Sequence, residues 1–238
     1  MKIALIGYGK MGKAIEAIAQ GRGHEVIHRI DINSPELLEK DQLSKADVAI
    51  EFTTPETAYH NILKCFDAGV PVICGTTGWL EKLPEVKAQC LEKHQAFLYA
   101  SNFSIGVNIF FELNRRLAEL MAPQPQYNVH MEEIHHTQKK DAPSGTAITL
   151  AEQIVDALPG KKSWVNEHTS NPEELFIESR RVDPAPGTHI VNYHSPIDDI
   201  TIIHTAHSRE GFAAGAVTAA EWLKGKKGIF TMKDVLSL

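Results

Sequence analysis

Over its first hundred residues the chain alternates short apolar runs with segments of helical periodicity. The run Lys2–Ile6 precedes a Gly-rich turn, and from Met11 the apolar residues recur at the spacing of one helix face. Strands that alternate with helices pair in parallel, because each helix carries the chain back across the sheet. We therefore predict a parallel sheet with helices on both faces. Further strands are predicted at Glu25–Asp31, Ala46–Phe52, Val70–Cys74 and Ala96–Ala100, with helices between Thr54 and Gly69 and near Leu83–His94.

The pattern changes after Asn102. A long helix is predicted from Ile105 to Met121, and strands then follow one another with a single helix, Thr146–Leu158, among them. This order favours a separate, mostly antiparallel or mixed sheet. The predicted strands are Tyr127–His136, Leu175–Val182, Thr188–His194 and Asp199–His207. The apolar residues in helical register on the long helix are Ile109, Phe110, Leu113, Leu117 and Leu120.

The predicted fold is thus α/β, with two domains in 238 residues. A Rossmann-like, parallel-sheet dinucleotide-binding domain comprises residues 1–103 and 211–238, the second part being an Ala-rich helix and tail that we expect to return to it. Residues 104–210 are predicted to form an α+β domain with a mixed or antiparallel sheet.

Composition excludes several classes of protein. Lys and Arg number 24 against 30 Asp and Glu, and this net charge of −6 argues against nucleic acid or a membrane surface as partner. The apolar runs are far shorter than the roughly 18 residues of a membrane span, and the N-terminus does not resemble a signal peptide. Cys65, Cys74 and Cys90 form no C-x-x-C pair, so we predict no disulfide framework and no metal site, and reduced thiols in a cytoplasmic protein.

Residues 7–12 read G-Y-G-K-M-G and fit the G-x-G-x-x-G fingerprint of dinucleotide-binding proteins. The motif follows a predicted strand, opens a helix and precedes the acidic Asp31, as the fingerprint requires. The alternatives are a glycine turn without a nucleotide and, for the later loops, ordinary turn residues. The residues predicted to contact the cofactor are Gly7, Tyr8, Gly9, Lys10, Met11, Gly12, Asp31, Phe52, Gly75, Thr76, Thr77, Ala100, Ser101, Asn102 and Phe103.

The residues around Asp31 bear on the choice of cofactor. A carboxylate repels a 2′-phosphate, and Ile32 stands where an arginine would favour NADPH, so NADH is slightly favoured. Arg29 lies on the same strand face as Asp31, and use of both NADH and NADPH therefore stays open.

The densest group of polar residues follows the strand predicted at Tyr127–His136. Residues 133–147 read E-I-H-H-T-Q-K-K-D-A-P-S-G-T-A, which places two histidines, two lysines and a helix N-terminus in one segment. Together they describe a carboxylate site beside a proton donor. Singly, the lysines are more often surface charges, and Ser-Gly-Thr can simply begin a helix. Adjacent histidines on a strand point to opposite faces, so the two do not serve one metal ion.

This segment resembles the signature of the 4-hydroxy-tetrahydrodipicolinate reductase family, E-x-H-H-x-x-K-x-D-A-P-S-G-T-A. Residues 7–12, 75–78, 102–108 and 208–217 also resemble family motifs in family order. The resemblance implies a two-domain enzyme, typically a homotetramer built by the sheets of the second domain. It implies that His135 is the proton donor and Lys139 its partner at the substrate. The residues that it implies for substrate binding are His136, Ser144, Gly145, Thr146 and Arg209.

The implied reaction transfers a hydride from NADH or NADPH to a cyclic imine dicarboxylate, with loss of water, in diaminopimelate and lysine biosynthesis. Closure of the domains would be hinged near residues 102–104 and 208–211. Alternatives are another two-domain NAD(P)-dependent dehydrogenase acting on a small amino-acid-like substrate, and an NAD(H)-sensing module. A semialdehyde dehydrogenase would need a reactive cysteine beside the His-Lys segment, and a sensor would need a recognition element; neither is evident. Of the 12 histidines, only His135 and His136 receive a role.

Overall fold

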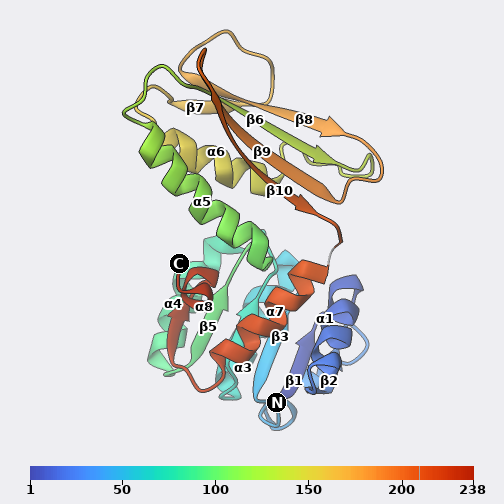
Figure 1. The fold of residues 1–238 in the computed structure, drawn as a ribbon. Helices are drawn as coiled ribbons and strands as arrows, with labels where there is room; N and C mark the ends of the chain where they lie inside the picture. The colour runs from blue at the N-terminus through green and yellow to red at the C-terminus, as the bar shows by residue number, and fades with distance from the viewer. Residues whose placement is uncertain (209) are drawn as a thin grey trace. The chain divides into compact units, whose positions relative to one another are not determined.

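The computed structural model describes residues 1–208 and 210–238, which divide into two compact units (Figure 1). One unit comprises Met1–Ile105 and Glu210–Leu238, and the other comprises Gly106–Arg209. Among the described helices, none combines the length and the apolar character needed to cross a bilayer.

The first unit is built on a parallel sheet with the strand order β11-β5-β4-β3-β1-β2. Along β1 the side chains alternate, so that Ile3 and Leu5 join one core while Ala4 and Ile6 join the other. Helices α1 and α7 cover the first of these faces, and α3 and α4 cover the second (Figure 1). The strands are β1 (Lys2–Ile6), β2 (Glu25–Ile30), β3 (Val48–Glu51), β4 (Val72–Cys74), β5 (Ala96–Tyr99) and β11 (Gly228–Phe230). The helices are α1 (Lys10–Gly21), α2 (Lys40–Leu43), α3 (Pro55–Asp67), α4 (Leu83–Glu92), α7 (Glu210–Leu223) and α8 (Met232–Leu236), with 3-10 turns at Pro35–Leu38 and Leu80–Lys82.

The order of these strands locates a ligand crevice. The chain passes from β1 to β2 on one side and then to β3 on the other, so the direction of winding reverses between β1 and β3. In sheets of this kind ligands bind at the carboxyl ends of the strands beside such a reversal. The turn after β1 and the loop after β3 both lie there.

The second unit has a mixed sheet with the order β10-β9-β6-β8-β7. Strand β6 runs parallel to β8 and antiparallel to β9, so the sheet of the second unit is mixed, and the predicted fold class is confirmed. One face packs against α5 and α6 around a core that includes Met131, Leu150 and Val191. The strands are β6 (Asn128–His135), β7 (Ser163–Val165), β8 (Glu174–Arg181), β9 (Gly187–His194) and β10 (Asp199–Ala206), and the helices are α5 (Ile105–Met121) and α6 (Gly145–Ala157).

Helix α5 buries only part of the apolar set that its sequence aligns: Phe110 lies in the core and Leu117 packs against it. Ile109, Leu113 and Leu120 remain about half exposed, whereas Asn114 is fully buried. The Asn114 amide donates hydrogen bonds to the Leu150 carbonyl at 3.0 Å and to the Gln153 side chain at 2.9 Å. These bonds satisfy the NH2 group of the amide and so offset the cost of burying that group.

Candidate active site

The turn between β1 and α1 has the geometry of a dinucleotide cradle. Gly7 adopts a φ of +97°, and a Cβ on it would lie 1.9 Å from the Phe52 carbonyl oxygen. A Cβ at Gly12 would lie 2.4 Å from the Gly7 oxygen, whereas one at Gly9 would meet no described atom within 4 Å. Helix α1 then begins at Lys10, and no described side chain caps its N-terminus. Open backbone at a helix N-terminus fits a pyrophosphate.

The acidic residue of the fingerprint follows β2 directly. Asp31 is exposed, and its Oδ1 accepts a hydrogen bond from the Asn33 amide at 2.8 Å. Arg29 instead pairs with Glu16 of α1, which also accepts a hydrogen bond from Tyr8. The hydrogen bond from Arg29 lowers the pKa of Glu16. The structure therefore ties Tyr8 and Arg29 to the helix that follows the glycine turn.

The other residues predicted for the cofactor lie in the loops after β3, β4 and β5. A Cβ on Gly75 would lie 2.2 Å from the Phe52 ring, so only glycine fits beneath that ring. Thr76 is buried, and its hydroxyl accepts a hydrogen bond from the Thr53 amide at 2.7 Å. Phe103 is only 2% exposed and belongs to the core of the first unit. In the same loops Thr77 and Ser101 are exposed, while Ala100 and Asn102 are half-buried.

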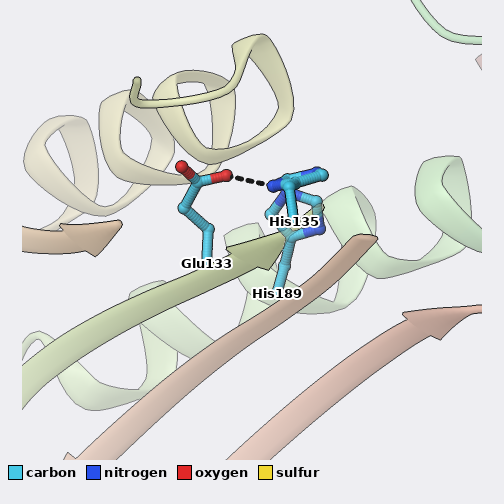
Figure 2. A group of neighbouring side chains, drawn as sticks. All are labelled: Glu133, His135 and His189. Atoms are coloured by element: carbon cyan, nitrogen blue, oxygen red, sulfur yellow. Dashed lines mark ion pairs between the residues drawn. The ribbon is translucent and has the colours of Figure 1, made fainter. Parts of the chain in front are cut away.

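The second unit holds a buried polar cluster at the end of β6. His135 is the last residue of this strand, and its Nδ1 lies 2.5 Å from Oε2 of Glu133 (Figure 2). The two side chains share a face because they are two residues apart on one strand. His189 of β9 packs against His135, with ring centroids 5.2 Å apart and nearly perpendicular planes. All three residues are more than nine-tenths buried.

Arg181 of β8 anchors the Glu133 carboxylate. One guanidinium nitrogen lies 2.9 Å from Oε1 of Glu133 and 2.7 Å from the Asp141 carbonyl oxygen. Burial raises the pKa of Glu133, but the facing side chains of His135, Ser179 and Arg181 together lower the pKa to about 2. Glu133 is therefore an anion at neutral pH.

His189 is neutral for the opposite reason. Burial, followed by the charge of His135, lowers the pKa of His189 to about 3. Its Nε2 lies 3.0 Å from the hydroxyl of Ser144, which caps α6 by accepting a hydrogen bond from the Ala147 amide at 3.2 Å. Because the Ser144 oxygen already accepts from the helix, its proton is available to His189.

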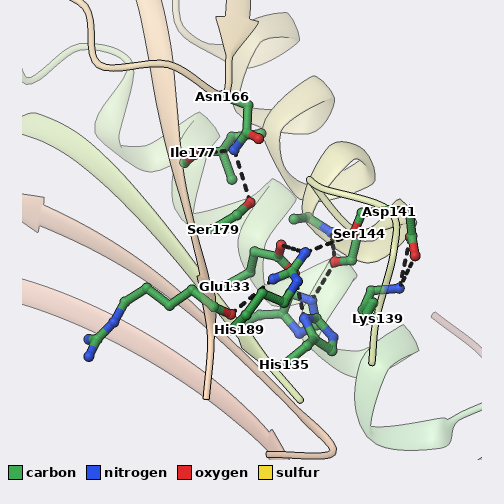
Figure 3. Close-up of polar contacts among 12 residues, drawn as sticks. Glu133, His135, Lys139, Asp141, Ser144, Asn166, Ile177, Ser179 and His189 are labelled. Atoms are coloured by element: carbon green, nitrogen blue, oxygen red, sulfur yellow. Dashed lines mark hydrogen bonds and ion pairs between the residues drawn. The ribbon is translucent and has the colours of Figure 1, made fainter. Parts of the chain in front are cut away.

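Lys139 lies in the loop between β6 and α6, near His135 and Ser144 (Figure 3). Its ammonium is 2.7 and 2.8 Å from the two carboxylate oxygens of Asp141, and this bond lowers the pKa of Asp141. The adjacent Lys140 is exposed. At the start of α6, a Cβ on Gly145 would meet no described atom within 4 Å, so the space beside this residue is open.

The structure thus gathers His135, Lys139 and Ser144 in one place, with Gly145 and Thr146 opening α6 beside them. His136 follows the end of β6 and is half-buried. The predicted role of Arg209 lies outside the described residues.

Family models match both parts of the chain. The model described as "Dihydrodipicolinate reductase, N-terminus" matches residues 1–103, and the one described as "Dihydrodipicolinate reductase, C-terminus" matches residues 106–236. The chain belongs to the dihydrodipicolinate reductase family. The resemblance inferred from the sequence motifs is confirmed.

Individual members of the dihydrodipicolinate reductase family support this assignment. A 4-hydroxy-tetrahydrodipicolinate reductase from Christiangramia forsetii is 50% identical over 239 aligned positions, which cover 100% of this chain and 98% of that protein. One from Methanosarcina mazei is 37% identical, covering 99% and 89%. The structure of a dipicolinate-bound dihydrodipicolinate reductase from Paenisporosarcina sp. TG-14 has the same fold, with a TM-score of 0.77 at 23% identity and 97% of each chain covered.

A probable dehydrogenase from Thermotoga maritima shares the architecture more distantly. Its TM-score is 0.59 at 9% identity, with 99% of this chain and 92% of that chain covered. At this level of identity the similarity concerns the fold alone.

Three residues of this family member's buried cluster had no role in the sequence analysis. Glu133 could have been found from the alternation of the strand, because it shares a face with His135. Arg181 and His189 come from other strands, where Arg181 pairs in register with His135, and His189 with Glu133. No local sequence pattern predicts how β6 is aligned with β8 and β9.

Glu133, His135 and His189 are also the described residues best placed to hold a metal ion, with one donor atom from each within 4.8 Å of the others. Two ligands of one zinc ion would lie roughly 3.3 Å apart, given bonds of about 2.0–2.1 Å in tetrahedral geometry. The 2.5 Å contact between Glu133 and His135 is shorter, and Arg181 already neutralises the carboxylate. This geometry favours an ion pair over a set of metal ligands.

The buried cluster should make the protein sensitive to acid. The pKa of His189 falls from 6.5 when unfolded to about 3 when folded, so protonation favours the unfolded chain progressively below pH 6.5. Glu133 adds to this loss only below pH 4.5, as the pH approaches its folded pKa of about 2. Between pH 6.5 and pH 4.5 we expect the melting temperature to fall by several degrees, at roughly 2–4 °C per kcal/mol for a chain of this size.

Thermal unfolding of the His189→Gln variant tests this assignment. Gln cannot be protonated, so the variant should lose much of the decline between pH 6.5 and pH 4.5. The matched control is His60→Gln, because His60 is exposed. A decline in the His189 variant equal to that of the wild type and the control would show that another group is responsible.

Proposed function

We propose that the chain catalyses the nicotinamide-dependent reduction of 4-hydroxy-tetrahydrodipicolinate to tetrahydrodipicolinate, with loss of water, in diaminopimelate and lysine biosynthesis. The observation that carries this proposal is the buried His135–Glu133 pair beside Lys139 and the N-terminus of α6. The group combines a proton donor with cations and amides suited to carboxylates. The names of the relatives from Christiangramia forsetii and Methanosarcina mazei point to the same substrate.

In this proposal the glycine turn of residues 7–12 and Asp31 hold the dinucleotide, through backbone amides and the ribose hydroxyls respectively. When bound, the reduced nicotinamide supplies a hydride. Addition of hydride to the unsaturated ring leaves an electron pair on the substrate, and His135 donates the proton that quenches it.

The remaining residues would orient the substrate. Lys139 and the amides of Gly145 and Thr146 bind the two carboxylates, while the Ser144 hydroxyl and His136 complete their contacts. The pair formed by Lys139 and Asp141 must open, or tilt, for the ammonium to reach a carboxylate.

The decisive experiment is a spectrophotometric assay of the purified protein with the hydroxylated dicarboxylate and NADH or NADPH. Substrate-dependent loss of the reduced-nicotinamide absorbance, with tetrahydrodipicolinate as product, is expected. Turnover of an amino acid or a semialdehyde in its place would favour the alternative dehydrogenase. Nicotinamide binding without turnover of any of these would favour a sensing module.

We propose that both nicotinamide cofactors are used, with NADH slightly preferred. Ile32, which follows Asp31, is 92% exposed, so an arginine can replace it without disturbing the core. The variant Ile32→Arg should raise kcat/KM for NADPH relative to NADH by about tenfold or more, because a charge-assisted hydrogen bond to the 2′-phosphate is worth roughly 1.5–3 kcal/mol. The control Ile32→Gln, which adds polarity without charge, should change this ratio far less. If the ratio of kcat/KM for NADPH to that for NADH is unchanged in both variants, the 2′-hydroxyl of the adenosine ribose does not lie beside residue 32.

We propose a homotetramer assembled through the sheet of the second unit. In support, β10 is an edge strand, and its Ile200 and Ile203 are 38% and 60% exposed. Light scattering should give four times the chain mass of 26.4 kDa. A monomeric mass would contradict the assembly.

We also propose that the protein works in the cytoplasm. Cys65, Cys74 and Cys90 are all buried and unpaired, and burial raises the pKa of each thiol. Such thiols are typical of proteins in a reducing compartment.

A further inference from the structure

Strands β6 and β8 carry two Glu–Arg pairs at adjacent positions and in opposite environments. Glu132 pairs with Arg180 at 2.8 Å, and half of the Arg180 side chain is exposed to solvent. Glu133 pairs with Arg181 at 2.9 Å, and its side chain is fully buried. Since successive residues of a strand face opposite sides of the sheet, only the second pair faces the cluster around His135. Exposed pairs contribute little, whereas a buried pair must satisfy both charges.

Each oxygen of the Glu133 carboxylate lies beside a basic group. Oε1 accepts from Arg181, and Oε2 lies 2.5 Å from Nδ1 of His135 (Figure 3). The guanidinium is itself fixed, because it also donates to the carbonyl oxygens of Asp141 at 2.7 Å and of Arg180 at 2.9 Å. The carboxylate therefore has one orientation, and that orientation is directed at a single nitrogen of the imidazole.

An anionic acceptor at Nδ1 determines which nitrogen of a histidine exchanges protons. It holds a proton on Nδ1, so the proton that leaves is the one on Nε2. Gly187 packs beside that edge of the ring, and because a Cβ at this position would lie 2.9 Å from Nε2, glycine keeps a side chain away from that nitrogen.

We propose that Glu133 and Arg181 are positioning residues for His135: Arg181 fixes the Glu133 carboxylate, and Glu133 keeps the proton on Nδ1, which reserves Nε2 for proton donation. This inference rests on the proposed function, in which His135 is the proton donor. The other titratable groups that face His135 are His189 on β9, whose imidazole is neutral, and Lys139 in the loop after β6, which is neutralised by Asp141. Glu133 is thus the one described anion in direct contact with the ring.

The Glu133→Gln variant preserves the shape of the side chain and removes its charge. We expect kcat to fall by about 10- to 100-fold, as is typical when the partner that orients a functional histidine is lost. KM for the nicotinamide should not change. The matched control is Glu132→Gln, which breaks the exposed pair and should leave kcat unchanged.

A double-mutant cycle separates positioning from a purely structural role. In a His135→Gln background, Glu133→Gln should cost less than about twofold, because its effect acts through the missing imidazole. If the two losses multiply in full, Glu133 does not act through His135, and the proposal is overturned. If Glu133→Gln does not fold because Arg181 is left unpaired, the double variant Glu133→Gln/Arg181→Met removes both buried charges. It should fold and still show a loss of kcat of about 10- to 100-fold.

Nitrogen-15 NMR of histidine-labelled protein tests the pair without any turnover. The His135 signals, identified by their loss in His135→Gln, should show a protonated Nδ1 in the neutral imidazole of the wild type and a changed tautomer in Glu133→Gln. If this is seen in a protein that does not reduce the dicarboxylate, the proposed function fails and the pairing stands. If the reductase is active and the His135 signals are identical in Glu133→Gln, the positioning role fails and the function stands.

Discussion

Replacing His135 with glutamine is expected to lower kcat by about 10²- to 10⁴-fold, the usual contribution of a positioned general acid. Glutamine fills a similar volume, and its amide can still donate to the Glu133 carboxylate, so the buried anion keeps a partner. What the variant lacks is a proton that can be transferred near neutral pH. KM for the nicotinamide should stay the same, because the cofactor is assigned to the loops of the first unit.

Steady-state kinetics with the hydroxylated dicarboxylate measures this effect. The control is His130→Gln on the same strand, where the histidine is exposed and should contribute nothing to turnover. The residual rate of the His135 variant should also lose its dependence on pH through the neutral range. A wild-type kcat in His135→Gln would contradict the assignment of His135 as the proton donor and of Glu133 as its positioning residue.

The parallel sheet could be predicted because its signals are local. Each strand is a short apolar run and each helix has an apolar face. The glycines of residues 7–12 mark the turn between the first strand and the first helix. Strands β7 and β11 are not predicted from the sequence because, unlike the equally short β4, they have no run of fully buried apolar residues. Strand β11 exists through its pairing with β5, which is a long-range contact that no periodicity reveals.

The buried face of α5 illustrates a second limit. The apolar residues of this segment recur at helical spacing, so the pattern predicts a helix. It does not show that Leu113 stays exposed while Asn114 is buried. The choice depends on acceptors on α6, where the Leu150 carbonyl and the Gln153 side chain receive the Asn114 amide. The acceptors that allow Asn114 to be buried lie 36 and 39 positions away in the sequence, so the local pattern does not reveal them.

The same distinction divides the candidate site. His135, Lys139 and Ser144 lie within ten residues of one another, so their type and spacing could be recognised together. Arg181 and His189 reach the same cluster from β8 and β9, through strand registers that only the folded sheet establishes. The surplus of histidines in the later strands acquires a partial explanation, because His189 packs on His135 and bonds Ser144.

Replacing Lys139 with alanine should lower kcat/KM for the dicarboxylate by about 10²- to 10³-fold. A hydrogen bond between charged groups contributes roughly 1.5–3 kcal/mol, which alone corresponds to about 10- to 100-fold. The structure adds a second cost, because Lys139 neutralises Asp141. Without the ammonium, the Asp141 carboxylate faces a dianionic substrate, and like charges disfavour binding. Nicotinamide binding should be unaffected.

Dipicolinate, a planar dicarboxylate that needs no turnover, allows the binding part of this effect to be measured by calorimetry. The matched control is Lys140→Ala, which removes an exposed lysine one position away and should leave Kd within about twofold. The double variant Lys139→Ala/Asp141→Asn should recover part of the lost affinity, because it removes the repulsion without restoring the hydrogen bond. A selective loss of nicotinamide affinity in Lys139→Ala would instead assign this lysine to the cofactor.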